Sequence, residues 1–431
     1  MKKKMIAMLL LTTTIVSLCF GACAPTDISP EASGITFSTE IPATAEPYEP
    51  VLIIPDEDET VDDAYLTLSM NLARMNYTQN ENMLISPASI EFALGMALAG
   101  AEGETLAQMN RVLGNTASRE EILAFCESYQ QKLGGKRNSY FNVANSIWIN
   151  KDIVKSSLKK PYTTTLDDVF DAESYCKPFT DATKNKINDW CSKKTDKMIP
   201  EILNQIDCNA AVYLINALSF DAKWEEPYEE YQIKEDIFHN EDGTEKNVNF
   251  LHDTLGVYYE IDNACGFHKY YEGGEYAFLA ILPDEEVGLE NFLKDFDADS
   301  YRSFMESATG QYDVYTKLPK FTNDYSVNLN EQLQMLGITD AFTPGVADFS
   351  GIIDKNQNDL FIDKVIHKTH IEVDENGTKA AAITLIEMND CCAAVEDEPE
   401  YREVYLDRPF LYMIVDMETE MPVFIGTVNQ F

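Results

Sequence analysis

Basic residues are scarce in this sequence, and their scarcity excludes several classes of partner. The 431 residues include 33 Lys and Arg but 73 Asp and Glu, which gives a formal net charge of −40 at pH 7. Nucleic acids, heparin-like polymers and anionic membrane surfaces are themselves negative and would repel such a chain. We therefore expect no nucleic acid, no heparin and no anionic lipid surface among the partners of the folded protein.

Catalytic motifs are also missing. The sequence contains no Walker loop, no GxGxxG, no HExxH and no GxSxG, the motifs that mark phosphate, dinucleotide, zinc and nucleophile sites. Its five histidines include His367 and His370, three residues apart in a strand-like context. Such a pair points to opposite faces of a strand and cannot share a metal ion. We therefore expect no enzymatic activity, no metal and no cofactor.

Paired cysteine motifs are absent as well. Seven cysteines follow the N-terminal region, none of them in a CxxC spacing: Cys126, Cys176, Cys191, Cys208, Cys265, Cys391 and Cys392. An odd number without such spacing does not indicate a disulfide framework. We expect most of these cysteines to be small buried hydrophobic residues.

The first residues have the pattern of a secretory signal peptide, predicted to span residues 1–24. Three lysines precede an apolar run from Met5 to Phe20, which is too short to span a membrane. Gly21-Ala22-Cys23 is similar to a bacterial lipobox, which would leave Cys23 lipid-modified as a membrane tether. Ala22-Cys23-Ala24 also fits an A-x-A cleavage that discards the cysteine. The protein is therefore expected to be secreted or extracellular, either released or held as a cell-envelope lipoprotein.

Residues 25–61 are predicted to form a disordered tether. They are rich in Pro, Thr, Ser, Glu and Asp and contain few large apolar residues, so they cannot bury enough surface to become ordered. A flexible chain of this length has its ends on the order of 35 Å apart. The remaining residues, 62–431, are predicted to form a single domain with a large core.

The body of the chain mixes helical and strand-like stretches. Helical spacing marks residues 62–76, 91–99, 105–114 and 182–195, and strand patterns mark 140–150, 210–220, 276–283 and 313–319. The almost wholly apolar run 210–220 is typical of a strand that is covered on both faces. Many strands with about eight or nine helices, without strict βαβ alternation, predict an α+β fold with large antiparallel or mixed sheets.

The stretch from Glu372 to Val395 is unusual. It is free of Pro, and its even-numbered residues from Thr378 to Met388 are all uncharged, whereas the odd-numbered set carries Lys379 and Glu387. One face of a strand would therefore suit burial and the other would suit water. An acidic, small-residue tract follows. The stretch is either an ordinary core-facing strand or a loop held outside a sheet but composed to enter one.

The flanks of this stretch resemble the serpin family. Residues 377–382, Gly-Thr-Lys-Ala-Ala-Ala, are similar to the proximal hinge of serpins, and residues 405–411, Tyr-Leu-Asp-Arg-Pro-Phe-Leu, to their C-terminal signature. The Ser86-Pro87-Ala88-Ser89 turn and the residues 216–224 also match. The resemblance covers almost all of the chain after about residue 62. It implies a serpin fold, with helices around three β-sheets, a large central sheet and an exposed reactive-centre loop.

The same resemblance implies a function and its residues. Serpins are suicide inhibitors of serine proteases: the protease cleaves the loop, forms an acyl-enzyme, and is trapped covalently when the freed hinge inserts as a new central strand. A monomer is expected. The matching hinge residues are Glu375, Gly377, Thr378, Ala380, Ala381, Ala382 and Thr384. The matching polar network beneath the parting sheet is Ser86, Ser89, Asn216 and His367, with Trp224 at the top of the sheet.

The position of the scissile bond follows from loop length. Counting from Glu375 places it at Cys391-Cys392, with Ala393, Ala394 and Val395 as runners-up because this loop is longer than is typical of the family. These residues are small and apolar, which suits elastase-like and subtilisin-like proteases. No Arg or Lys lies between Asp390 and Tyr401, which excludes trypsin-like ones. A non-inhibitory serpin-fold binding module and a cysteine-protease inhibitor remain as alternatives.

Overall fold

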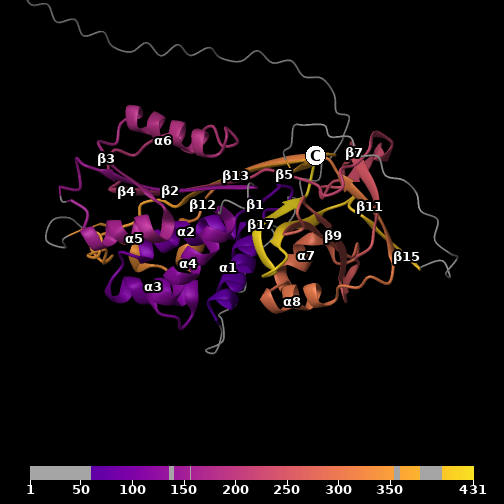
Figure 1. Ribbon diagram of the computed structural model, residues 1–431, viewed down its shortest axis with the longest axis horizontal. Coiled ribbons are helices and arrows are strands. Elements are labelled where there is room, and N and C mark those ends of the chain that lie inside the picture. Colours follow the sequence, from indigo (N-terminus) through magenta and orange to yellow (C-terminus); the bar gives the residue numbers. More distant parts are fainter. Residues whose placement is uncertain (1–59, 135–139, 156, 354–359, 379–399) are drawn as a thin grey trace, which may run out of the picture. The chain divides into compact units, whose positions relative to one another are not determined.

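Helices and sheets form stacked layers (Figure 1). The computed structural model describes residues 60–134, 140–155, 157–353, 360–378 and 400–431. All of these residues belong to one unit, 50–431. The predicted signal peptide, the tether up to residue 59 and the loop residues 379–399 lie outside the described part.

The described residues contain nine α-helices, within the predicted range. They are α1 (Val61–Asn76), α2 (Pro87–Leu98), α3 (Gly103–Gly114), α4 (Arg119–Gly134), α5 (Lys160–Phe170), α6 (Asp181–Lys194), α7 (Gly288–Asp295), α8 (Ala298–Glu306) and α9 (Asn330–Met335), with two 3₁₀ turns, η1 (Glu230–Gln232) and η2 (Asp340–Phe342). Helix α2 begins earlier than the predicted residue 91. Ser86 caps it by accepting a hydrogen bond from the Ser89 N–H at 3.2 Å, and Pro87 occupies the first helical position.

Two sheets lie in the half of the body that contains the C-terminus. The six-stranded one has the order β1 (Leu84–Ile85), β17 (Met421–Val428), β16 (Phe410–Asp416), β10 (Tyr276–Pro283), β9 (Ala264–Tyr270), β8 (Tyr259–Ile261). A four-stranded one has the order β15 (Tyr401–Tyr405), β11 (Asp313–Pro319), β7 (Glu245–Leu255), β6 (Ile233–His239). Strands β10 and β11 have the predicted bounds. The fold is α+β, as predicted.

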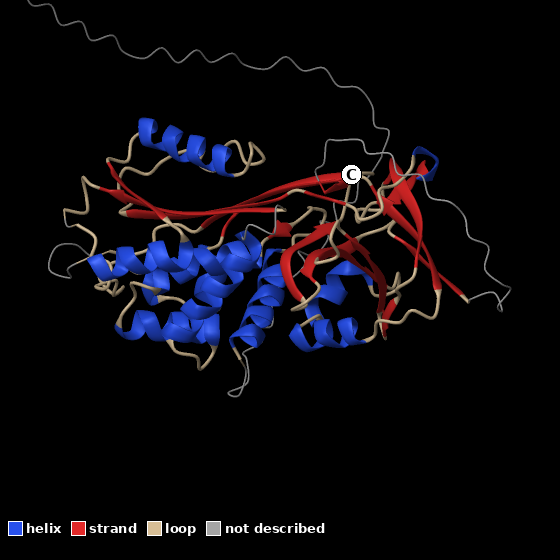
Figure 2. Ribbon diagram, viewed as in Figure 1, coloured by secondary structure: helices blue, strands red, loops and turns tan. Residues whose placement is uncertain are grey.

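The remaining strands form two hydrogen-bonded groups that lie end to end in one layer (Figure 2). One has the order β3 (Glu173–Lys177), β2 (Phe141–Asn150), β4 (Val212–Phe220), and the other β12 (Phe321–Asn328), β13 (Ile366–Val373), β14 (Gly377–Thr378), β5 (Ala222–Lys223). Strand β5 follows directly on β4, so both groups belong to one long layer (Figure 2). Hydrogen bonding therefore divides the described strands into four groups, where three sheets were predicted, because no ladder joins β4 to β13 in the described residues.

Helices cover both faces of this long layer. Ribbon α6 lies over one face and α2, α4 and α5 lie under the other (Figures 1 and 2). Along β4, Tyr213, Ile215 and Ala217 pack in one hydrophobic cluster with Ile187 and Trp190 of α6. The opposite face, including Leu218 and Phe220, packs in the main core with α2. This arrangement confirms that the run 210–220 is covered on both faces.

The cysteine prediction is only partly right. Cys126 and Cys191 are buried and Cys265 is half-buried, but Cys176 and Cys208 are exposed. Cys176 lies on β3, whose burial alternates along its length, and its side chain falls on the solvent side. Cysteines 391 and 392 lie outside the described residues.

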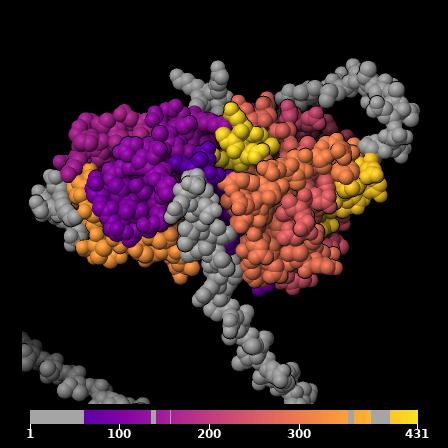
Figure 3. Space-filling model, turned by 90° about the horizontal axis from the view of Figure 1, so that it is seen from below, coloured from indigo at the N-terminus to yellow at the C-terminus, as the bar shows by residue number. Residues whose placement is uncertain are grey.

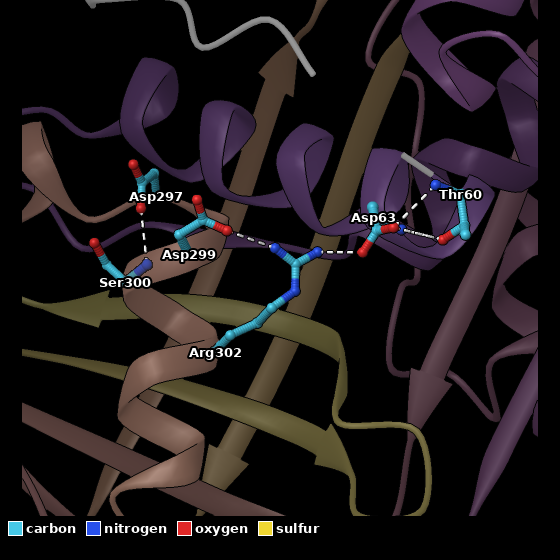
Figure 4. Close-up of polar contacts among 6 residues, drawn as sticks. All are labelled: Thr60, Asp63, Asp297, Asp299, Ser300 and Arg302. Atoms are coloured by element: carbon cyan, nitrogen blue, oxygen red, sulfur yellow. Dashed lines mark hydrogen bonds and ion pairs between the residues drawn. The ribbon is translucent and has the colours of Figure 1, made fainter. Parts of the chain in front are cut away.

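An ion-pair network joins the first helix to α8 (Figure 4). Thr60 and Asp63 form a reciprocal capping box at the start of α1. The Arg302 guanidinium pairs with Asp63 and, at 2.8 Å, with Asp299. The network therefore fixes the N-terminal end of α1 against α8. None of the described helices is both long and apolar enough to cross a membrane.

Candidate functional site

The hinge begins as a tight turn after β13. The Asp374 carboxylate accepts hydrogen bonds from the backbone N–H groups of Asn376 at 2.7 Å and Gly377 at 3.2 Å. The Asp374 N–H in turn donates to the Gly377 carbonyl at 3.0 Å. An Asx turn of this kind reverses the chain, so that Thr378 pairs with Val373 in antiparallel register.

Strand β14 lies between β13 and β5. Gly377 and Thr378 pair with Lys223 and Ala222 on the side away from β13. A Cβ on Gly377 would lie 2.2 Å from the Ala222 carbonyl oxygen, and its φ is +154°. Only glycine allows so close an approach of the two backbones. The predicted hinge residues Gly377 and Thr378 are thus already paired as a strand.

Thr378 shows which face of the hinge points inward. Its side chain is fully buried, and its Oγ1 lies 2.6 Å from the Tyr271 hydroxyl. The even-numbered face is therefore the buried face at this position, as the charge pattern predicted. The predicted hinge residues Ala380, Ala381, Ala382 and Thr384 and the scissile candidates Cys391, Cys392, Ala393, Ala394 and Val395 lie outside the described residues.

Trp224 packs against the hinge turn. Its ring stacks on Tyr271 with centroids 4.6 Å apart, and its Nε1–H donates to the Asp374 carbonyl at 2.8 Å. Its backbone N–H donates to the Asn376 carbonyl at 2.9 Å. Tyr228 adds a backbone bond to the Glu375 carbonyl at 2.9 Å. Trp224 is therefore in direct contact with the hinge turn, and the contribution of Tyr271 was not predicted.

Glu375 is held by Lys320, which connects β11 and β12. The two side chains form an ion pair. Burial raises the pKa of the Glu375 carboxyl, but the hydrogen bond and charge of Lys320 outweigh burial, and the net pKa is lowered. Glu375 is therefore an anion at neutral pH and fixes the turn against the neighbouring strand.

The predicted polar network connects α2 to both halves of the layer. The Ser86 backbone N–H donates to His367 Nε2 on β13 at 3.0 Å, and the Ser86 hydroxyl donates to the Val423 carbonyl at 2.8 Å. The Ser89 hydroxyl donates to Asn216 Oδ1 on β4 at 2.5 Å. Because both serines lie in the first turn of α2, this turn holds β13 and β4 side by side.

The network extends further than predicted. The Asn216 side-chain amide donates to Asn145 Oδ1 at 2.7 Å, and the Asn145 amide donates to the Phe170 carbonyl and to Gln130 Oε1, both at 2.9 Å. Asn145 lies on β2 directly opposite Asn216 and is almost fully buried. No local signal marked Asn145, because β2 also contains the polar residues Asn142, Ser146 and Asn150.

His367 is neutral in this network. Its side chain is buried, and burial lowers its pKa to about 4. The Ser86 N–H requires a lone pair on Nε2, so the imidazole carries its proton on Nδ1. His370, three residues along β13, instead contacts Asp324 at 2.8 Å on the other face, as predicted.

A mainly apolar cavity lies between α2, β4 and the residues 360–365 that lead into β13. It is partly open to solvent. It is lined by Ala93, Leu94 and Ala97 of α2, Val212 and Leu214 of β4, and Phe349, Ile352, Leu360, Phe361, Ile362, Lys364 and Val365. The cavity continues the line of β14 beyond the polar network. It suits apolar side chains.

A family model described as Serpin (serine protease inhibitor) matches residues 63–431. The chain belongs to the serpin family. Serpins are inhibitors of serine proteases and not enzymes, so a target protease is the partner that family membership implies. This result confirms the resemblance, the serpin fold and the absence of an enzymatic role.

Relatives and solved structures agree with this assignment. Iripin-1 of Ixodes ricinus is 29% identical over 360 residues, which cover 81% of this chain and 89% of that protein. Leukocyte elastase inhibitor A of Mus musculus is 29% identical over 361 residues, covering 80% of this chain and 92% of that protein. The thermophilic serpin tengpin in its native state is 37% identical, with a TM-score of 0.79 and coverage of 89% and 97%. Tengpin in its latent state gives a lower TM-score, 0.74, with 36% identity and coverage of 87% and 99%.

Proposed function

We propose that this serpin is a suicide inhibitor of serine proteases with elastase-like or subtilisin-like specificity. The observation that carries the proposal is the position of Gly377 and Thr378 as strand β14 between β13 and β5. A strand that has already begun needs only to be extended, so the costly first pairing is made before cleavage.

The register of β14 supports this extension. Thr378 pairs with Val373 on one side and Ala222 on the other. Six residues further along the same register, Thr384 would lie between His367 and Asn216. Its hydroxyl can donate and accept, so the polar network would be rebuilt around the inserted strand.

The lower part of the inserted strand would reach the apolar cavity. Two residues beyond Thr384, the same register places Ile386 between Val365 and Leu214, and both of these residues line the cavity. Ile386 belongs to the uncharged even-numbered face. The composition of the loop and the lining of the cavity therefore agree.

The energy of insertion is large enough to trap a protease. An inserted strand of about fourteen residues gains ladder hydrogen bonds worth roughly 0.5–1.5 kcal/mol each. Burial of its even-numbered face adds to this. The sum, of order 10–20 kcal/mol, competes with the packing of a protease active-site loop before the acyl-enzyme is hydrolysed.

The specificity follows from the loop residues. The proposed scissile bond is Cys391-Cys392, with Ala393, Ala394 and Val395 as runners-up, all small and without positive charge. Such residues fit the shallow primary pocket of elastase-like and subtilisin-like enzymes. The name of leukocyte elastase inhibitor A, similar over most of this chain, agrees with this target class.

The location proposed for the protein is the outside of a bacterial cell. Residues 1–24 would direct secretion, Cys23 would be lipid-modified, and residues 25–61 would tether the inhibitory domain. Mass spectrometry of the mature N-terminus tests this: a diacylglyceryl cysteine at position 23 supports the lipoprotein, and an N-terminus at or after Ala24 contradicts it.

Mixing residues 60–431 with neutrophil elastase and with subtilisin tests inhibition. We expect a band at the summed mass that survives boiling in denaturant, and mass spectrometry of the released C-terminal peptide then identifies the scissile bond. The Thr384→Arg variant is the matched control: it retains the cleavage site but cannot bury its strand, so it should be cleaved without the band. Cleavage of the parent protein with no covalent band and no rise in melting temperature would contradict inhibition and favour a non-inhibitory binding module. A covalent complex with papain alone would move the target to cysteine proteases.

A further inference from the structure

Two exposed tyrosines lie side by side on the four-stranded sheet that contains β15, the strand that follows the reactive loop in sequence. Tyr315 on β11 is 41% exposed and Tyr401 on β15 is 60% exposed. Their ring centroids are 5.6 Å apart. The ring pair Trp224 and Tyr271, by contrast, is buried. A solvent-facing aromatic pair has no role in the core and is typical of a contact surface.

Carboxylates surround this pair. Strands β11 and β15 run parallel, with Asp313 opposite Tyr401 and Tyr315 opposite Glu403. Glu403 is exposed, and the Glu400 side chain, 79% exposed, precedes the strand. We call Asp313, Tyr315, Glu400, Tyr401 and Glu403 the tyrosine surface.

The two nearby cations are already paired, Arg402 with Glu400 of the surface itself and Lys317 with Asp236 outside it. The Arg402 guanidinium lies 3.9 Å from the centre of the Tyr312 ring and 4.0 Å from Glu400. Lys317 donates to Asp236 at 2.7 Å and lies 4.6 Å from the centre of the Tyr405 ring. The tyrosine surface therefore presents aromatic rings within a mainly negative rim.

The chain itself connects this surface to the reactive loop. Strand β15 begins at Tyr401, and in the space-filling view its yellow residues lie beside the orange residues of β11 at one edge of the body (Figure 3). The six residue steps from Val395 to Tyr401 span at most about 21 Å, and the ten steps from Cys391 to Tyr401 at most about 35 Å. A protease of ordinary size is on the order of 45 Å across. A protease bound at the scissile bond is therefore wide enough to reach the tyrosine surface.

We propose that the tyrosine surface is a second contact for the captured protease, and that it selects a protease whose surface beside the active site is basic. The inference rests on the proposed function, because the protease held by the loop is the occupant. Aromatic residues provide much of the binding energy of such contacts, and complementary charge raises the rate of association.

The test uses residues 60–431 with neutrophil elastase and with subtilisin. The double variant Tyr315→Ala/Tyr401→Ala removes the rings, and Glu403→Lys reverses one charge. Tyr231→Ala is the matched control, because Tyr231 is 77% exposed and lies in η1, beside β6 at the opposite edge of the same sheet. Melting temperatures establish that each variant is folded. The second-order rate of protease inactivation is measured at low and high salt.

We expect the double variant to inactivate at least one of the two proteases about tenfold more slowly, with an unchanged stoichiometry of inhibition. Glu403→Lys should lower the rate at low salt and weaken its salt dependence. Tyr231→Ala should react like the parent protein. Equal rates for the double variant and the parent with both proteases would overturn the proposal, as would an equal loss in Tyr231→Ala.

Binding to a protease whose catalytic serine is replaced by alanine separates this inference from the proposed function. Such a protease forms the encounter complex but cannot be trapped. Weaker binding of the double variant supports the second contact even where no covalent band forms with active protease. Unchanged binding overturns the second contact even where the parent protein traps efficiently. Self-association of the parent protein that is lost in the double variant would overturn the proposal in favour of a contact between copies of this chain.

Discussion

Acid should loosen the junction between β4 and β13 through His367. The Ser86 N–H donates to Nε2 of this buried imidazole. Protonation places a second donor where the lone pair was, so the bond between α2 and β13 is lost. Burial of the imidazole is what lowers the pKa of His367.

The size of the effect follows from the pKa. The usual value of 6.5 is lowered to about 4 in the folded protein. As the pH falls below 6.5, the unfolded chain binds a proton that the folded chain does not. The stabilisation is therefore fully present above pH 6.5 and is lost between pH 6.5 and pH 4, and it amounts to about 3 kcal/mol.

Two measurements test this reasoning. Urea titrations of the parent protein and of His367→Gln from pH 8 to pH 4.5 give the free energy of unfolding, and their difference should change by most of this amount below pH 6.5. Uptake of a synthetic peptide that copies residues 377–390 reports opening of the sheet, and it should be faster at pH 5 than at pH 7.5 in the parent but not in His367→Gln.

His268 provides the matched control. Burial also lowers its pKa to about 4, and its Nδ1 lies 2.7 Å from the Tyr259 hydroxyl in the six-stranded sheet. His268→Asn should alter the pH dependence of unfolding but leave the acid-induced peptide uptake intact. Uptake that is independent of pH in the parent protein, or equally reduced in both variants, would refute the role assigned to His367.

Three other changes test separate contacts. Gly377→Ala would place a Cβ 2.2 Å from the Ala222 carbonyl oxygen, so β14 must separate from its neighbour, and we expect a higher stoichiometry of inhibition because more loops are cleaved without insertion. Asn145→Ala removes the acceptor of the Asn216 amide and should lower the free energy of unfolding in urea by about 1–3 kcal/mol; an unchanged midpoint would contradict this. Glu91→Gln removes a fully buried carboxyl whose pKa burial raises from 4.5 to about 8. Because the unfolded chain releases that proton at lower pH, the variant should be more stable by about 3 kcal/mol at pH 7 but not at pH 4.

Local sequence patterns predicted those features of the site that depend on strand alternation or on the start of a helix. The uncharged even-numbered face implied that Thr378 points inward, and it is fully buried. Helical spacing predicted a helix at 91–99, and α2 is present there, although its cap at Ser86 makes it begin earlier. The three-residue spacing of His367 and His370 implied opposite faces, and the two side chains have different surroundings. These features depend only on neighbours in sequence.

Partners that lie far apart in sequence could not be predicted in this way. Tyr271 is 107 residues from Thr378, and Asn145 is 71 residues from Asn216. Glu91 gave no local signal of burial, because a charged residue in a helix ordinarily marks the solvent side. The sequence also contained no sign that β14 is already paired in the intact chain, since that depends on the close approach of Gly377 to Ala222.

The polar network and the hinge affect different aspects of insertion: the first affects its rate, and the second affects whether it is completed. The first turn of α2 bonds to His367 on β13 and to Asn216 on β4, so a strand that extends β14 must break at least one of these bonds before it passes. Each bond contributes about 0.5–1.5 kcal/mol, whereas complete insertion is worth of order 10–20 kcal/mol. The network is therefore too weak to prevent insertion by a cleaved loop, but it is placed where it delays the first steps. In the proposed mechanism the network controls how fast the sheet opens, and the uncharged face of the loop controls whether insertion goes to completion.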